Sequence, residues 1–176
     1  MVFRDAYGER FDTLLVCGTY HPYRRHGEKN PNFDAYSGLL LDLKENKLRA
    51  IEHFREFLEE RVREDVPIAV VPSHDPAKTT SGLRTLAERL AAADRIDATD
   101  CLVRAEKIDK LAHGGDRSIE VHLKTIQVAK PELIKGRDVL LLDDITTSGN
   151  SLLACQQLLL KAGAKRVQML AFAKTA

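Results

Sequence analysis

The feature that most constrains this chain is an apolar run that ends in two adjacent carboxylates and a small, hydroxyl-rich loop. Residues 139–142 are Val-Leu-Leu-Leu, Asp143 and Asp144 follow, and residues 145–151 read Ile-Thr-Thr-Ser-Gly-Asn-Ser. Residues 152–161 then have the composition of a helix. A strand, a sharp turn and a helix N-terminus in this order bind anions, because the first N–H groups of a helix have no partner within it. Carboxylates beside such a loop can hold hydroxyl groups or a metal ion, so we expect a sugar phosphate with magnesium.

Apolar segments of strand length alternate with segments of helical period along most of the chain. Strands are predicted at residues 14–17, 66–72, 101–103, 139–142 and 167–173, and helices at 46–65, 83–90 and 152–161. Residues 118–128 fit either a strand or a helix by their period. This alternation predicts an α/β fold with a mostly parallel sheet that helices cover on both faces.

Three predicted loops follow strands of this sheet, whereas residues 21–32 form a polar, turn-rich loop before it. Ligands of open α/β sheets bind beyond the carboxyl ends of the strands. The loops at residues 73–80, 104–117 and 143–151 should therefore converge on the functional site.

Composition narrows the class of protein. A chain of 176 residues that is 44% apolar and 30% charged is expected to form one globular domain over residues 1–176. A net charge of +1 provides no general attraction to nucleic acid or to an anionic membrane. The three cysteines contain no Cys-x-x-Cys pair, so we expect neither a disulfide framework nor a zinc site, and Cys155 should act as a small hydrophobe. No long apolar segment opens the chain, and together with free thiols this predicts a cytoplasmic protein without a membrane span.

The segment from Val139 to Ser151 resembles the phosphoribosyl pyrophosphate (PRPP) motif of class I phosphoribosyltransferases, in which an apolar strand, two acids and a phosphate loop follow one another. A helix, Ala162-Gly163-Ala164 and a closing strand come next, which is most similar to ComF-like phosphoribosyltransferases. The resemblance implies the class I phosphoribosyltransferase fold, a mostly parallel sheet flanked by helices. It also implies a small N-terminal hood over residues 1–40 and a core over residues 41–176.

The resemblance also implies roles for individual residues. Asp143 and Asp144 would accept hydrogen bonds from the ribose hydroxyls and stabilise positive charge at the anomeric carbon. The loop for the 5-phosphate would comprise Ile145, Thr146, Thr147, Ser148, Gly149, Asn150 and Ser151. The loop for the pyrophosphate would comprise Ser73, His74 and Asp75. Arg104, Lys107, Lys110 and Arg117 would lie in a catalytic loop that closes over the pyrophosphate.

The resemblance also implies a magnesium ion and an acceptor substrate. Substrate oxygens and water would hold most of the Mg²⁺, with Asp143 and Asp144 as the candidate protein ligands. A nitrogen acceptor, a nucleobase or a related heterocycle, would displace pyrophosphate from the anomeric carbon of PRPP. Thr147 stands where purine-using members have an acid, which disfavours purine salvage. Stacking groups for the acceptor would come from the hood, where Tyr20, His21, Tyr23 and Phe33 are the candidates.

Two other functions are compatible with these residues. A regulator that senses PRPP or a nucleotide would keep the site without the chemistry, and a ComF-type accessory protein in DNA uptake or repair would act through protein contacts. The resemblance makes a homodimer one candidate assembly. His113 and His122 are expected to be ordinary surface residues.

Overall fold

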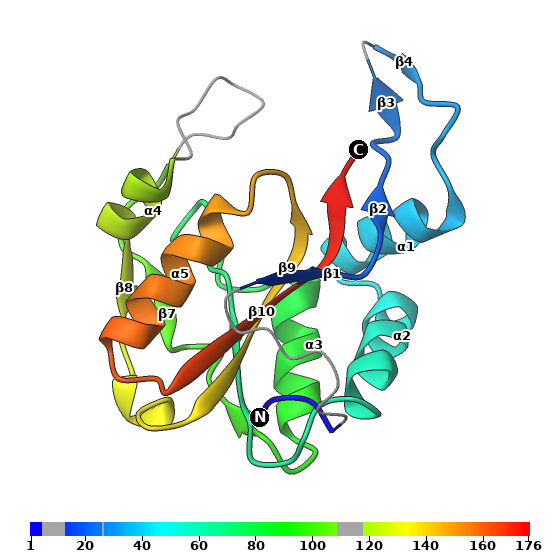
Figure 1. Ribbon diagram of the computed structural model, residues 1–176. Coiled ribbons are helices and arrows are strands. Elements are labelled where there is room, and N and C mark those ends of the chain that lie inside the picture. Colours follow the sequence, from blue (N-terminus) through cyan, green and yellow to red (C-terminus); the bar gives the residue numbers. More distant parts are fainter. Residues whose placement is uncertain (5–12, 26, 109–117) are drawn as a thin grey trace.

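The computed structural model describes residues 1–4, 13–25, 27–108 and 118–176 (Figure 1). Its elements are, in chain order, β1 (Leu14–Val16), β2 (Thr19–Tyr20), β3 (Arg24–Arg25), β4 (Glu28–Lys29), α1 (Ala35–Lys44), α2 (Leu48–Glu59), β5 (Pro67–Val70), α3 (Gly82–Ala91), β6 (Ile96–Asp97), β7 (Leu102–Arg104), α4 (Ile119–Thr125), β8 (Ile126–Val128), a 3₁₀ turn (Pro131–Leu133), β9 (Asp138–Thr146), α5 (Asn150–Lys161) and β10 (Arg166–Thr175). Among the described residues, none of the helices combines the length and the apolar character that a bilayer crossing requires.

A parallel sheet forms the centre of the protein. Its strand order is β1-β10-β9-β5-β6, and β2 pairs with the far end of β10. Every pairing in this sheet is parallel, with Leu141 opposite Met169 between β9 and β10 and Leu142 opposite Val70 between β9 and β5. The sheet confirms the predicted α/β architecture, because each of its long strands came from an apolar run of the sequence.

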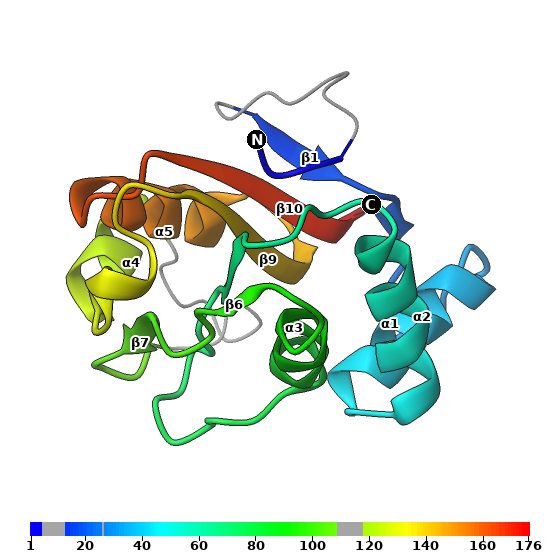
Figure 2. The same cartoon turned by 90° about the horizontal axis from the view of Figure 1, so that it is seen from below.

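The two faces of the sheet carry separate apolar cores. Leu140 and Leu142 of β9 pack with α1, α2 and α3, whereas Val139 and Leu141 pack on the opposite face with α5 and the β7–β8 pair. This alternation follows from the two-residue period of a strand. Figure 2 shows α4 and α5 on one side of β9 and β10 and α1 to α3 on the other. Helices therefore cover both faces of the sheet, as the strand and helix alternation predicted, and α4 packs outside α5.

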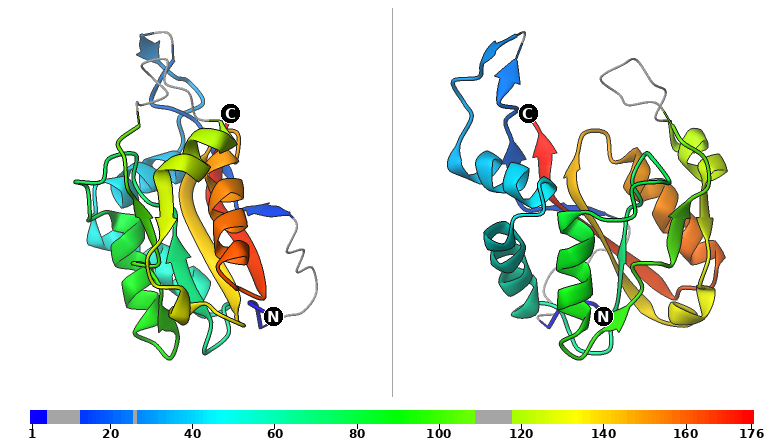
Figure 3. Two further views of the ribbon diagram at one scale, coloured as in Figure 1. Left: turned by 90° about the vertical axis from the view of Figure 1, so that its left-hand side faces the viewer. Right: turned by 180° about the vertical axis from the view of Figure 1, so that it is seen from behind.

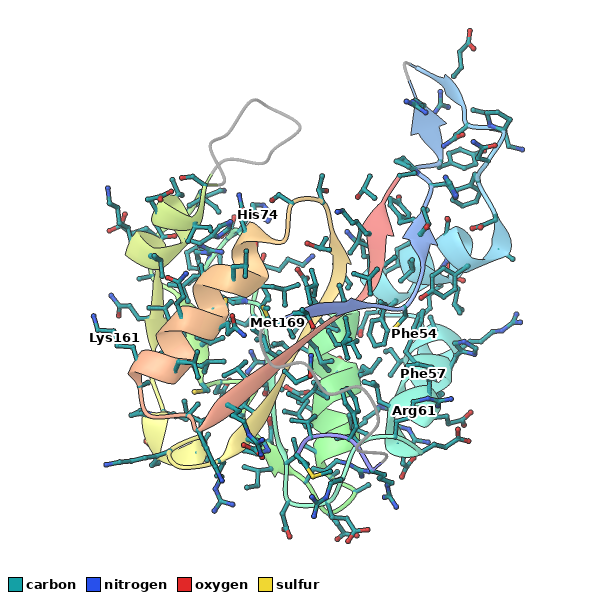
Figure 4. All side chains as sticks on the ribbon, in the orientation of Figure 1. Phe54, Phe57, Arg61, His74, Lys161 and Met169 are labelled. Atoms are coloured by element: carbon teal, nitrogen blue, oxygen red, sulfur yellow. The ribbon has the colours of Figure 1, made fainter. Side chains whose placement is uncertain are left out.

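The core beneath α2 is aromatic. Phe54 of α2 packs against Phe172 of β10, with 4.4 Å between the ring centroids, and both rings are buried. Figure 4 shows Phe54 and Phe57 on α2 and Arg61 in the turn after it, on the far side of β10 from Lys161 of α5. The helical spacing of apolar residues predicted this helix, although it spans Leu48–Glu59 and is shorter than residues 46–65.

Three local predictions need correction. The strand expected at residues 101–103 exists as β7, but it pairs antiparallel with β8 outside the central sheet. Residues 118–128, whose period was ambiguous, form α4 and then β8, so the two patterns occupy successive halves of one segment. Residues 21–32, predicted as a loop, contain the short antiparallel hairpin β3–β4.

The hairpin β3–β4 and the first part of α1 belong to residues 1–40, the segment that the resemblance predicted as a hood. The hairpin stands beyond the C-terminal end of β10, at the end of the molecule where α5 begins (Figures 1 and 3). Its base is held by Tyr23 against Phe33, whose rings meet edge to face at 5.1 Å. The hydroxyl of Tyr36 in α1 donates a 2.6 Å hydrogen bond to the carbonyl of Phe172, which ties the hood to the sheet.

An ion pair at the opposite end of the sheet makes stability depend on pH. Arg166 begins β10 and lies opposite Asp138 at the start of β9, with 2.8 Å between Nε and a carboxylate oxygen. Hydrogen bonding to this guanidinium lowers the pKa of Asp138 to about 2. A lowered folded-state pKa means that the stabilisation is present above the unfolded-state pKa and is lost as the pH falls toward 2.

We expect Asp138→Asn to lower the free energy of unfolding by about 1–2 kcal/mol at pH 6, because it removes the charge that Arg166 binds. The difference from the wild type should shrink steadily between pH 5 and pH 2. Urea unfolding followed by circular dichroism measures both values. Glu132→Gln, an exposed change in the neighbouring 3₁₀ turn, is the control. A difference that stays constant over this pH range would contradict the role of the pair.

Candidate functional site

A cavity of about 810 Å³ lies at the carboxyl ends of the central strands. Its lining comes from residues 70–74 at the end of β5 and beyond it, residues 143–151 at the end of β9 and in the turn that follows, and Arg104 at the end of β7. The described parts of the three predicted segments therefore meet at this cavity, although residues 143–146 continue β9 and are not a loop. Of the described residues predicted for the site, two from the loops do not line it, Asp75 and Lys107. The predicted stacking groups of the N-terminal segment do not line it either: Tyr20, His21, Tyr23 and Phe33. Lys110 and Arg117 lie outside the described residues.

The acid pair stands at the rim of β9. One oxygen of Asp143 accepts a 2.9 Å hydrogen bond from the backbone N–H of Asp144, and one oxygen of Asp144 accepts a 2.6 Å bond from that of Ile145. Lys44, the last residue of α1, lies 3.7 Å from the Asp144 carboxylate. Both carboxylates are partly exposed to the cavity, and each has oxygen capacity beyond its own backbone contact. The pair can therefore accept hydrogen bonds from hydroxyl groups or bind a cation.

The turn between β9 and α5 depends on Gly149. This residue is the N-cap of α5 and has φ +84°, a left-handed conformation that favours glycine. Glycine has no side-chain oxygen to cap the helix, so an anion can take the place of the cap at the first-turn N–H groups. The predicted strand, turn and helix N-terminus are confirmed, and they face the cavity.

The hydroxyl groups of this turn make different contacts. Thr147 Oγ1 lies 3.1 Å from Thr175 Oγ1 at the end of β10, and Ser148 Oγ accepts a weak 3.4 Å bond from the Asn150 N–H. Ser151 Oγ lies 3.1 Å from His122 Nε2 of α4. The turn is thus held by β10 on one side and by α4 on the other.

The loop after β5 is held by ion pairing and by a buried arginine. Lys107 pairs with Asp75 at 2.8 Å, and this hydrogen bond lowers the pKa of the Asp75 carboxyl. The carbonyl of Ser73 accepts a 2.9 Å bond from Arg104 Nε. The carbonyl of His74 accepts a bond of 3.0 Å from the Ile108 N–H, and Figure 4 shows His74 at the end of the molecule where α5 begins.

Arg104 lies in a different environment from the one expected. It ends β7 and is only 7% exposed, so it is part of the framework under the loop at residues 73–75 and not of a loop that closes over a ligand. Besides Ser73, it contacts Thr125 Oγ1 at 2.6 Å and His122 Nδ1 at 3.3 Å. Its charge still reaches the cavity, because Arg104 is one of the lining residues.

His122 contradicts the expectation of an ordinary surface residue. It is 1% exposed and lines the cavity, and His113 lies outside the described residues. The sequence carries one signal for this placement: His122 and Thr125 are three residues apart and form the buried side of α4. The burial of His122 could not be inferred from this spacing, because the period of residues 118–128 did not distinguish a helix from a strand.

Three cations of the cavity wall were also missed. Lys44, Lys78 and Arg84 line the side formed by α1, the loop after β5 and α3. They come from three separate segments, so only tertiary packing brings them to one cavity. Arg84 is held by Glu88 and Asp100, whereas the positive charge of Lys44 and Lys78 complements a ligand with several phosphate groups.

The donor set can be compared with what a magnesium ion requires. Within the described part of the chain, His, Cys, Asp and Glu side chains nowhere gather in threes to form a metal site. Asp143 and Asp144 supply carboxylate oxygens next to the helix N-terminus at Gly149. This suits Mg²⁺, since this ion keeps several waters and uses one or two carboxylates with substrate phosphates. The residues therefore fit an ion that arrives with its substrate.

Comparison with known proteins identifies the class. The family model for the phosphoribosyl transferase domain matches residues 84–175, which contain the acid pair, the turn and α5. The chain belongs to this family. It therefore has the α/β fold of class I phosphoribosyltransferases, and the family membership supports a transferase.

Other comparisons are less specific. A solved structure of phosphoribosylpyrophosphate synthetase from Mycobacterium smegmatis is 21% identical, with a TM-score of 0.36. The similarity covers 74% of this chain and 33% of the synthetase, so the chain corresponds to about a third of that protein. Among curated proteins, none matches the chain.

Proposed function

We propose that this protein is a magnesium-dependent phosphoribosyltransferase that binds PRPP and transfers its phosphoribosyl group to a nitrogen acceptor, releasing pyrophosphate. The observation that carries the proposal is one cavity in which an acid pair lies beside an uncapped helix N-terminus. Membership of the phosphoribosyl transferase family supports it. The acceptor is proposed to be a nucleobase or a related heterocycle.

The cavity suits the parts of PRPP. The N–H groups at the start of α5, which follow Gly149, would bind the 5-phosphate. Asp143 and Asp144 would accept hydrogen bonds from the ribose hydroxyls, and their negative charge would offset the positive charge that develops at the anomeric carbon. The loop at residues 73–75 would hold the pyrophosphate, with Lys44 and Lys78 adding positive charge from the cavity wall.

The reaction forms one bond and breaks one. The lone pair of the acceptor nitrogen bonds to the anomeric carbon while the bond from that carbon to the pyrophosphate oxygen breaks, and pyrophosphate leaves with the electron pair. The proton that the acceptor nitrogen carried then passes to solvent. Mg²⁺, when bound with PRPP, would neutralise charge on the pyrophosphate. Tyr20 of the hood is the proposed acceptor contact. It lies outside the cavity lining, but it pairs with Thr175 of β10, whose hydroxyl lies 3.1 Å from Thr147 Oγ1 in the turn. Burial, and then the charge of Asp144, raise the pKa of its phenol.

The test is calorimetry of PRPP binding with and without Mg²⁺, followed by an assay of pyrophosphate release with a panel of nitrogen heterocycles. We expect PRPP to bind more tightly with Mg²⁺ and pyrophosphate to appear only with a suitable acceptor. Ribose 5-phosphate with free pyrophosphate is the control, because it separates binding of the parts from binding of the whole. Binding of PRPP without pyrophosphate release from any acceptor would indicate the sensor, and absence of binding would refute the proposal.

Three narrower proposals concern the subfamily, the assembly and the cellular location of the protein. A ComF-like role is supported by the segment that follows α5, where Gly163 ends the helix with φ +102° before the closing strand β10. A homodimer and a cytoplasmic location are proposed on resemblance and on the free state of Cys17, Cys101 and Cys155.

A further inference from the structure

We infer that His122 is a positioning residue: a neutral imidazole that turns the Ser151 hydroxyl into a hydrogen-bond donor for the 5-phosphate. The inference rests on the proposed function, because it assumes that a sugar phosphate occupies the turn before α5. His122 belongs to α4, outside the motif that defines the phosphate turn. It is nonetheless buried, and it lies between the turn and the framework of the neighbouring loop.

Both ring nitrogens of His122 have a defined neighbour. Nδ1 lies 3.3 Å from a terminal nitrogen of Arg104, and Nε2 lies 3.1 Å from Ser151 Oγ. The guanidinium cannot turn away easily, because its other nitrogens donate to the carbonyl of Ser73 and to Thr125 Oγ1. Thr125 in turn donates to the carbonyl of Val121, so each group in this cluster has an assigned direction.

The chemistry of Arg104 determines the proton on His122. A guanidinium is always protonated and only donates hydrogen bonds. The nitrogen that faces it, Nδ1, must therefore accept, which places the proton of the neutral imidazole on Nε2. Protonation of Nδ1 would set an N–H against the N–H of Arg104, beside a positive charge, in a buried position.

The proton on Nε2 then determines the direction of Ser151. Nε2–H donates to Ser151 Oγ, and a serine hydroxyl has one proton to donate. That proton is left for a ligand in the cavity, which Ser151 lines in the first turn of α5. With the opposite tautomer, Ser151 would donate to the imidazole and present lone pairs to the phosphate, which is repulsive. His122 thus makes Ser151 complementary to an anion without touching the anion itself.

The tautomer can be tested without any ligand. Long-range ¹H–¹⁵N correlation spectra of the ¹⁵N-labelled protein at neutral pH report which ring nitrogen carries the proton. We expect the Nε2–H form for His122, assigned by comparison with His122→Gln. The Nδ1–H form or an imidazolium would overturn the inference.

The consequence for binding is tested with ribose 5-phosphate, which carries the 5-phosphate but no pyrophosphate. We expect His122→Ala to weaken its binding about tenfold, the size of one hydrogen bond to a charged group. His122→Gln should restore most of the affinity, because its amide places an N–H donor near the position of Nε2. His122→Ala in a Ser151→Ala background should add little further loss, since the two residues act in series.

Controls separate this inference from the proposed function. Lys124→Gln changes an exposed residue of the same helix and should bind ribose 5-phosphate like the wild type. Three results would overturn the inference. The first is additive losses of affinity from His122→Ala and Ser151→Ala, and the second is a His122→Gln variant that binds as weakly as His122→Ala. The third is a wild type that does not bind ribose 5-phosphate. If these results appear as expected while PRPP yields no pyrophosphate, the positioning role stands and the proposed transferase activity fails.

Discussion

Replacing Asp143 and Asp144 together by Asn is expected to weaken PRPP binding at least about a hundredfold, because two charged acceptors for the ribose hydroxyls become neutral and each such hydrogen bond contributes about 1.5–3 kcal/mol. Asn keeps the oxygen that accepts from the N–H of the next residue, so the backbone contacts of Asp143 and Asp144 survive. The loss should therefore appear in binding and hardly in stability.

Calorimetry with PRPP and Mg²⁺ measures the binding loss, and thermal unfolding measures stability. Asp42→Asn, a change of the same chemistry on α1 outside the cavity, is the matched control and should bind PRPP like the wild type. The pair of Asp144 with Lys44 is partly exposed, so its loss should cost little in stability. Unchanged PRPP affinity in the double variant would show that the acid pair is not the ribose site.

Gly82→Ala is expected to destabilise the protein by about 2–4 kcal/mol, an overpacking cost at the upper end of the usual range. Gly82 begins α3, and a methyl group there would lie 1.8 Å from the Leu43 carbonyl oxygen and 3.2 Å from the Asn46 Cα. Both neighbours are backbone atoms of the α1–α2 connection. A change of side-chain rotamer therefore cannot relieve the clash, and the start of α3 must move away from the end of α1.

This displacement should also reach the site. Lys44 ends α1 beside Asp144, and Gly82 itself lines the cavity, so the two helices share one wall of it. Urea unfolding followed by circular dichroism measures the loss of stability. Gly38→Ala in α1 is the matched control: its methyl group would lie 3.7 Å from the Phe33 ring, an ordinary contact, and helix propensity predicts a gain of about 0.5–1 kcal/mol. Equal stabilities for Gly82→Ala and the wild type would contradict the close contact.

The elements that could be predicted from the sequence depend only on neighbouring residues. The apolar run at residues 139–142 and the helical period at residues 152–161 specify β9 and α5, because each pattern buries a face regardless of its neighbours. The turn between them needs a residue that accepts a positive φ and small polar neighbours, and Gly149 within this turn meets the requirement. The half of the candidate site for which anion binding is proposed was therefore predictable from one continuous segment.

Other parts depend on distant contacts. β7 has a strand pattern, but nothing in it distinguishes pairing with β8 from a place in the central sheet. The hairpin β3–β4 pairs only two residues on each strand, too few for an alternating pattern to emerge from its charged sequence. Such short elements are decided by what they pack against, and propensity contributes little.

By itself, the sequence determined the α/β architecture, the turn at Gly149 before α5 and the place of the acid pair at residues 143–144, since all of these arise from patterns within a few consecutive residues. Only the tertiary structure decided that Arg104 is buried beneath the loop at residues 73–75, that His122 lies between Arg104 and Ser151, and that Lys44 reaches Asp144. These residues come from separate elements, and their roles depend on distances that no local pattern encodes. The physical reason is that a strand end or a helix start is a property of neighbouring residues, whereas a buried hydrogen-bond network depends on how those elements pack.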